Sequence, residues 1–117
     1  MNPIEFEFFE RPNGHNEFVE FLTSLPKRDQ AELLRVLDKT RTHGMLIAQR
    51  QQWVKKIDGN LYELRSKVSS NTQRALYFHV ENGHYVITHG FTKKTQKTPK
   101  REIDHAKQIR KEYEDGK

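Results

Sequence analysis

The chain has 117 residues, with 21 Lys and Arg against 16 Asp and Glu, six His and no Cys. This length predicts one domain spanning residues 1–117, since domains of about 100–150 residues are the commonest size. The absence of Cys excludes a disulfide scaffold and a Cys-ligated zinc or iron–sulfur site. Apolar runs of only a few residues argue against a membrane span, and the acidic N-terminal segment differs from a signal peptide. We therefore expect a cytoplasmic protein.

Charge is unevenly distributed along the chain. Residues 1–40 carry five Lys and Arg against eight Asp and Glu, whereas residues 41–117 carry sixteen against eight. The stretch 82–101 has no acidic residue. Its cations are Lys93, Lys94, Lys97, Lys100 and Arg101. A basic half in a small protein indicates a polyanionic partner such as nucleic acid, and a solvated Lys-rich loop is the structural alternative.

The first half of the sequence predicts a strand and two helices. Residues 4–9 (IEFEFF) alternate apolar and acidic side chains, which is the period of a strand with one buried face. Apolar residues within 18–25 recur at i, i+3, i+4 and i+7, one stripe of a short helix. Pro26 suits the first turn of a second helix, and Gly44 is a typical helix end. We expect these two helices to form a hairpin.

The second half predicts a sheet. Segments 61–68 (LYELRSKV), 72–80 (TQRALYFHV) and 84–92 (HYVITHGFT) have the character of strands. Asn82-Gly83 separates the last two strands and is the strongest short hairpin signal. Residues 45–57 have no clear period, and we expect a loop or a helical turn there that carries Trp53 as a packing anchor.

Thr98-Pro99 predicts the start of a C-terminal helix, with Thr98 as the cap and Pro99 at the first position. The element order is therefore β-α-α-β-β-β-α. This order predicts an α+β fold, in which an N-terminal strand and a helical hairpin pack on a small antiparallel sheet followed by a C-terminal helix.

Alternation of side chains across a strand predicts where the cations point. In the first of the three strands, Arg65 and Lys67 point away from the face that bears Leu64. In the third strand, His89 shares its face with Ile87. The cations that we expect to converge on one face or edge of the sheet are Arg65, Arg74, His89, Lys93 and Lys94.

Such a set of side chains suits RNA cleavage in which a 2′-hydroxyl attacks its own 3′-phosphate. The reaction needs a base for the hydroxyl proton, cations for the pentacovalent phosphate and an acid for the leaving 5′-oxygen. Arginine binds phosphate through its planar fork, and histidine titrates near neutral pH. The sequence has no metal-ligand motif, phosphate-binding glycine loop or serine-nucleophile motif, so neither a metal nor a cofactor is implied.

Four motifs occur in order in the second half. They are Tyr62-Glu63-Leu64-Arg65, Arg74-Ala75-Leu76-Tyr77-Phe78, His89-Gly90-Phe91-Thr92-Lys93-Lys94, and Thr98-Pro99 with Glu102 and Ala106. Through these motifs, residues 55–113 closely resemble the RelE/ParE superfamily of bacterial toxins, and within it the phage-associated, HigB-like branch. The first half matches only in its strand and helical hairpin.

The resemblance implies a RelE-like fold and the toxin of a type II toxin–antitoxin system. Such a toxin is an mRNA interferase: a metal-independent endoribonuclease that cuts mRNA on the ribosome and inhibits translation. The resemblance also implies a HigA-like helix-turn-helix antitoxin, and contact with operator DNA only through the toxin–antitoxin complex. Two alternatives stay open, a ParE-like gyrase poison and a non-catalytic partner of an antitoxin that regulates the operon.

The resemblance also suggests roles for individual residues. Arg74 matches a phosphate-binding arginine, and Arg65 matches a basic residue at the end of the preceding strand. RelE has lysines where this chain has Tyr62 and Glu63, so Glu63 or His89 becomes the candidate general base. The region that matches a base-stacking tyrosine of RelE, residues 99–101, has no aromatic side chain.

Two groups of candidate site residues follow. The candidate catalytic residues are Glu63, Arg65, Arg74, His89, Lys93 and Lys94. The candidate RNA- or ribosome-binding residues are Lys55, Lys56, Lys97, Lys100 and Arg101.

Each candidate also has a structural alternative. Arg74 can form a salt bridge with Glu63 across adjacent strands, Arg65 can pair with an acid on the C-terminal helix, and His89 can belong to the core. The lysines can be solvated or can hold an acidic segment of the antitoxin.

Overall fold

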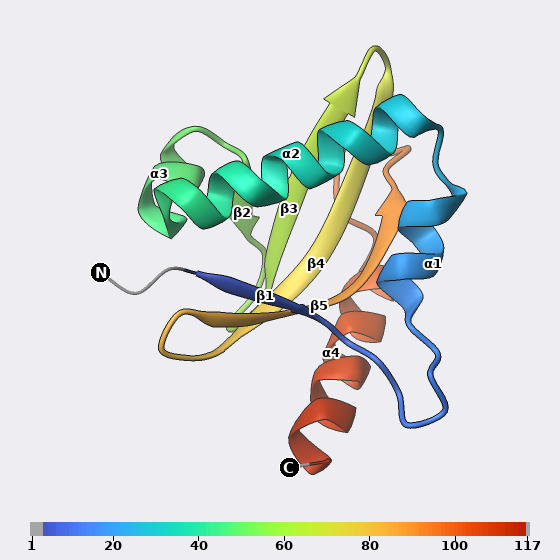
Figure 1. Cartoon of the computed structure of the whole chain (residues 1–117), viewed down its shortest axis with the longest axis vertical. Coiled ribbons are helices and arrows are strands. Elements are labelled where there is room, and N and C mark those ends of the chain that lie inside the picture. Colours follow the sequence, from blue (N-terminus) through green and yellow to red (C-terminus); the bar gives the residue numbers. More distant parts are fainter. Residues whose placement is uncertain (1–3, 117) are drawn as a thin grey trace.

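The computed structural model describes residues 4–116, which form five strands and four helices (Figure 1). In chain order they are β1 (Glu5–Phe8), α1 (Glu17–Ser24), α2 (Lys27–His43), α3 (Met45–Arg50), β2 (Val54–Lys56), β3 (Tyr62–Val68), β4 (Asn71–Glu81), β5 (His84–Thr92) and α4 (Lys100–Asp115). The α+β fold class is confirmed. Residues 1–3 and 117 of the expected domain lie outside the described residues.

The strands form one mixed sheet with the order β1-β5-β4-β3-β2. Strands β2 to β5 pair antiparallel with their neighbours, as the sequence predicts for the last three, whereas β1 runs parallel to β5. Residues 45–57, expected to be a loop or a helical turn, contain both α3 and the short edge strand β2. The predicted element order is therefore incomplete by one helix and one strand.

The turns and helix ends largely follow the sequence signals. Asn82 and Gly83 both have positive φ, which the tight turn between β4 and β5 requires. Gly44, with φ of 91°, separates α2 from α3. The expected role of Thr98 as the cap of α4 is wrong, because Pro99 occupies that position and the Thr98 hydroxyl bonds elsewhere.

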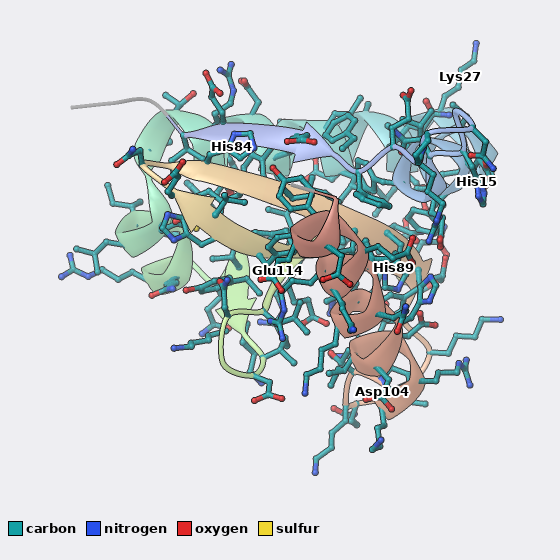
Figure 2. All side chains as sticks on the ribbon, turned by 90° about the horizontal axis from the view of Figure 1, so that it is seen from below. His15, Lys27, His84, His89, Asp104 and Glu114 are labelled. Carbon is teal, nitrogen blue, oxygen red and sulfur yellow. The ribbon has the colours of Figure 1, made fainter. Side chains whose placement is uncertain are left out.

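The sheet lies between two helical layers, with α1 and α2 on one face and α4 on the other (Figure 2). The core on the first face includes Phe18, Leu33, Leu64, Tyr77 and Ile87, all fully buried. The core under α4 is smaller and includes Leu61, Leu76, Phe78, Ala106 and Ile109. Each fully buried large apolar side chain contributes about 1.5–3 kcal/mol. The larger core therefore attaches α1 and α2 to the sheet more strongly than the smaller core attaches α4.

A β-bulge in β5 changes which side chains share a face. Leu76 of β4 is opposite His89, but the next residue, Tyr77, is opposite Ile87, so Thr88 is an extra residue. The predicted common face of Ile87 and His89 is therefore wrong. Ile87 packs in the core beneath α1 and α2, and His89 faces α4.

Among residues 4–116, none of the four helices combines the length and the apolar character needed to cross a bilayer.

Candidate functional site

The candidate site occupies the part of the α4-facing side of the sheet that α4 leaves uncovered. Leu76 and Phe91 contact α4, and the positions paired with them or next to them carry charged side chains. In the strand register, Glu63 is opposite Leu76, and Arg65 is opposite Arg74. Two like charges directly opposite each other on a sheet repel, so this pair needs a compensating anion.

Glu63 supplies that anion. Its side chain is 1% exposed, and its Oε2 atom lies 3.5 Å from Nε of Arg65 and 3.6 Å from Nε of Arg74. The other carboxylate oxygen, Oε1, accepts a hydrogen bond of 2.5 Å from the Thr98 hydroxyl. The expected salt bridge between Glu63 and Arg74 is confirmed, whereas Arg65 pairs with Glu63 rather than with an acid on α4.

The geometry leaves hydrogen-bonding capacity at this ion cluster. Nε of Arg65, Nε of Arg74 and Oε2 of Glu63 are buried, and none of them has a hydrogen-bond partner. At 3.5–3.6 Å these contacts are ionic rather than hydrogen-bonded. One carboxylate also balances just one of the two guanidinium charges. The cluster therefore keeps a net positive charge, which faces any ligand that binds beside it.

An open cavity of about 840 Å³ lies next to this cluster, between the β3–β4 turn and the segment after β5. Its cationic lining residues are Arg65, Lys67, Arg74, Lys93 and Lys94. Hydroxyl and amide groups complete the polar lining, from Ser70, Asn71, Thr72, Thr92, Thr95 and Gln96. Five cations around this open cavity, which we call the cationic cavity, form a site that is suited to a phosphate group.

Burial lowers the pKa of two of these cations. Desolvation lowers the pKa of the Arg74 guanidinium, although Glu63 opposes the shift. Desolvation also lowers the pKa of the Lys93 ammonium; Glu63 opposes this shift, and the positive charges of Arg74 and Arg65 add to it. Lys93 therefore releases its proton more easily than a surface lysine does.

Residues 20–111 match the family model described as phage derived protein Gp49-like (DUF891). The chain belongs to the Gp49-like family. This is a family of RelE-like and toxin-like proteins that is associated with toxin–antitoxin systems. No curated protein matches the chain. The matched residues extend from α1 into α4, so they include every residue that lines the cationic cavity.

His89 of this Gp49-like protein lies away from the cavity lining, beside α4 (Figure 2). It is 5% exposed, and both ring nitrogens are engaged, Nε2 with Glu102 at 3.0 Å and Nδ1 with the Thr88 hydroxyl at 3.0 Å. Burial lowers the pKa of His89, and the hydrogen bond to Glu102 opposes that shift. The structure thus gives His89 a role in joining β5 to α4.

The other predicted cations of the Gp49-like chain line two flanking cavities. Lys55 and Lys56 of β2 line one of about 460 Å³ together with Arg65. The other flanking cavity, of about 740 Å³, shares Thr92, Lys94 and Thr95 with the cationic cavity. Its further cationic lining residues are Lys97, Lys100 and Arg101. The structure therefore arranges all the predicted lysines and arginines around one basic surface.

Sequence reasoning missed Lys67, Thr98 and the uncharged lining residues of the site in this Gp49-like protein. Lys67 shares the strand face of Arg65, a signal that is sufficient to nominate it, and it lines the cationic cavity. The sequence predicts Thr98 as a helix cap, and no sequence pattern indicates that its hydroxyl binds Glu63.

Proposed function

We propose that this Gp49-like protein is the toxin of a type II toxin–antitoxin system and cleaves mRNA on the ribosome. The observation that carries the proposal is the pair of guanidiniums, Arg65 and Arg74, at an open cavity with three further cations. Their charges exceed what Glu63 can balance. A pentacovalent phosphate carries more negative charge than the ground-state phosphodiester, so fixed cations lower the barrier to its formation.

The reaction that fits this cavity is attack of a ribose 2′-hydroxyl on the adjacent 3′-phosphate. The 2′-oxygen–phosphorus bond forms as the bond from phosphorus to the 5′-oxygen breaks, leaving a cyclic phosphate and a free 5′-hydroxyl. Arg65 and Arg74 stabilise the phosphate in the transition state. The net positive lining of the cavity also repels a divalent cation, which favours a metal-independent reaction.

We assign the proton transfers to lysines. Lys93 lines the cavity and has a lowered pKa, so we assign it as the base that accepts the 2′-hydroxyl proton. Lys94, exposed on the same rim, then protonates the leaving 5′-oxygen. Glu63 is enclosed by two arginines, which supports a positioning role, and His89 is buried outside the cavity.

We also propose that the protein belongs to the HigB-like branch and acts in the cytoplasm, with residues 1–117 as one toxin domain. A HigA-like helix-turn-helix antitoxin would neutralise it, and the complex would bind operator DNA. The flanking cations around Lys55 and Lys100 are available for ribosomal RNA.

The test compares wild-type protein, Arg74→Ala and the control Lys111→Ala, whose side chain is exposed near the end of α4. Each is added to mRNA-programmed ribosomes and to free mRNA, and primer extension locates the cuts. We expect cuts only on the ribosome, with wild type and Lys111→Ala, and loss of at least 100-fold in rate with Arg74→Ala.

Three results would contradict this proposal. Undiminished cleavage by folded Arg74→Ala would move the site elsewhere. Intact mRNA combined with a DNA-damage response in cells would indicate a gyrase poison. Normal growth during strong expression without an antitoxin would indicate a non-catalytic partner.

A further inference from the structure

A further, smaller cavity of about 310 Å³ lies at the edge of β3. It shares four lining residues with the cationic cavity, namely Arg65, Lys67, Thr72 and Arg74. The two cavities therefore meet around the same side chains. A ligand with a phosphate in the larger cavity can extend directly into the smaller one.

The short length of β2 creates this space. Strand β2 pairs with β3 at Tyr62, Glu63 and Leu64, and one backbone bond from Arg65 follows, so β3 from residue 66 onward lies at the edge of the sheet. Glu32, Val36 and Lys39 of α2 form the opposite wall of the cavity. The space is thus bounded by a strand edge on one side and by a helix on the other.

Trp53 is the aromatic member of that lining, and it is the single tryptophan of the chain. Its ring is half-buried against the main core, and the ammonium of Lys39 lies 4.4 Å from the ring centroid. Its backbone oxygen accepts a hydrogen bond of 2.9 Å from the amide of Arg65. Trp53 is therefore the packing anchor that the sequence predicts, and its indole also lies in a cavity that Arg65 lines.

The chemistry of this lining fits a nucleobase. Bases stack on indole rings with little dependence on their identity. An ammonium over a half-exposed indole is a weaker contact than base stacking, so an entering base can displace Lys39. Ser66 lines the same cavity, and its Oγ is buried without a hydrogen-bond partner, so it is available to a polar edge of the base.

We propose that Trp53 is the stacking platform for a base of single-stranded RNA whose phosphate occupies the cationic cavity. Lys39 and Ser66 also line this base site, and Arg65 with Arg74 connects it to the phosphate. The inference rests on the proposed function, because it identifies the part of the RNA that this site holds.

The fluorescence of the single tryptophan gives a direct test. Wild-type protein is titrated with a 2′-O-methyl tetranucleotide, which cannot be cleaved, and with an abasic oligomer carrying the same phosphates. We expect both to bind, with saturable quenching of Trp53 fluorescence by the tetranucleotide alone. We also expect Trp53→Leu to weaken binding of the tetranucleotide about tenfold and to leave binding of the abasic oligomer unchanged.

Because Trp53 also packs against the core, the variant is used only if its circular dichroism and unfolding midpoint match those of wild type. The wild-type titration stands without it. Equal quenching by the two oligomers, or the absence of saturable quenching by the tetranucleotide, would overturn the inference. Cleavage on the ribosome without quenching removes the base site and keeps the nuclease, whereas quenching without cleavage removes the nuclease and keeps the base site.

Discussion

At the level of single residues, the charge of Glu63 decides whether Arg65 and Arg74 can lie opposite each other. We predict that Glu63→Gln, which keeps the side-chain shape and can still accept from Thr98, destabilises the fold by about 3 kcal/mol. The reason is that two guanidiniums with 25% and 10% exposed side chains lose their shared counter-ion. The free energy of unfolding in urea at pH 7 measures the effect.

A double variant tests this explanation of Glu63. Adding Arg65→Gln removes one of the two facing charges, so it should recover part of the stability lost in Glu63→Gln. If Glu63→Gln abolishes cleavage at unchanged stability, Glu63 is the general base and its positioning role is wrong.

The sequence predicted the members of this cluster better than their partners. Alternation along the strand correctly placed Arg65 and Lys67 together, since the period of a strand depends on the backbone alone. It did not show that Arg65 pairs with Glu63, its neighbour on the same face of β3, because the choice of partner depends on how far each long side chain extends. The bond from Thr98 to Glu63 joins residues 35 positions apart, and no local pattern encodes it.

At the level of elements, Gly90 sets the distance between α1 and β5. A Cβ atom at this position would lie 2.3 Å from Cδ2 of Phe21 and 3.1 Å from the backbone oxygen of Arg74. We predict that Gly90→Ala destabilises the fold by about 1–3 kcal/mol, because the Phe21 ring must move. Thermal or urea unfolding measures the loss.

The control for Gly90 is a double-mutant cycle with Phe21→Ala. If the ring causes the strain, Gly90→Ala costs less in the Phe21→Ala background than in wild type. Equal costs in the two backgrounds would assign the strain to the backbone of β4 instead.

The junction of β5 with α4 should depend on pH through His89. Burial lowers its pKa below the ordinary 6.5, so the unfolded chain binds a proton more readily than the folded chain does. We therefore predict that stability is lost as the pH falls from about 6.5 through the lower folded pKa. The measurement is the free energy of unfolding as a function of pH.

His89→Gln isolates this effect from the other titrating groups. The variant keeps a polar side chain near Thr88 and Glu102 but cannot titrate. Its stability should fall less steeply with acid than that of wild type. Parallel pH profiles for the two proteins would show that His89 does not carry the dependence.

The elements that the sequence failed to predict are those without a local signal. The helix Met45–Arg50 and the strand Val54–Lys56 are too short to show a period. The parallel pairing of β1 with β5 joins residues far apart in the chain, so its direction follows from packing and not from local pattern. The bulge at Thr88 moves His89 to the face of α4, and alternation cannot anticipate an extra residue.

At the level of the whole molecule, the predicted cations of the second half line the cationic cavity and the two cavities that flank it, whereas the first 40 residues are net acidic. If the five cations of the cationic cavity contact phosphates, binding of single-stranded RNA releases about 0.7 counterions for each phosphate contact. We predict a slope of about −3.5 in a plot of log affinity against log salt concentration. Titration of a 2′-O-methyl oligonucleotide at several salt concentrations gives this slope.

Two lysine variants show whether this slope belongs to the cavity. Lys94 lines the cavity, so Lys94→Ala should make the slope shallower by about 0.7. The matched control is Lys111, which lies near the end of α4 beside Asp115, so Lys111→Ala should leave the slope unchanged. The number of counterions released depends on the number of cations that bind phosphate. A flat salt response in wild type, or equal changes in the two variants, would therefore show that phosphate contacts at this cavity do not hold the RNA.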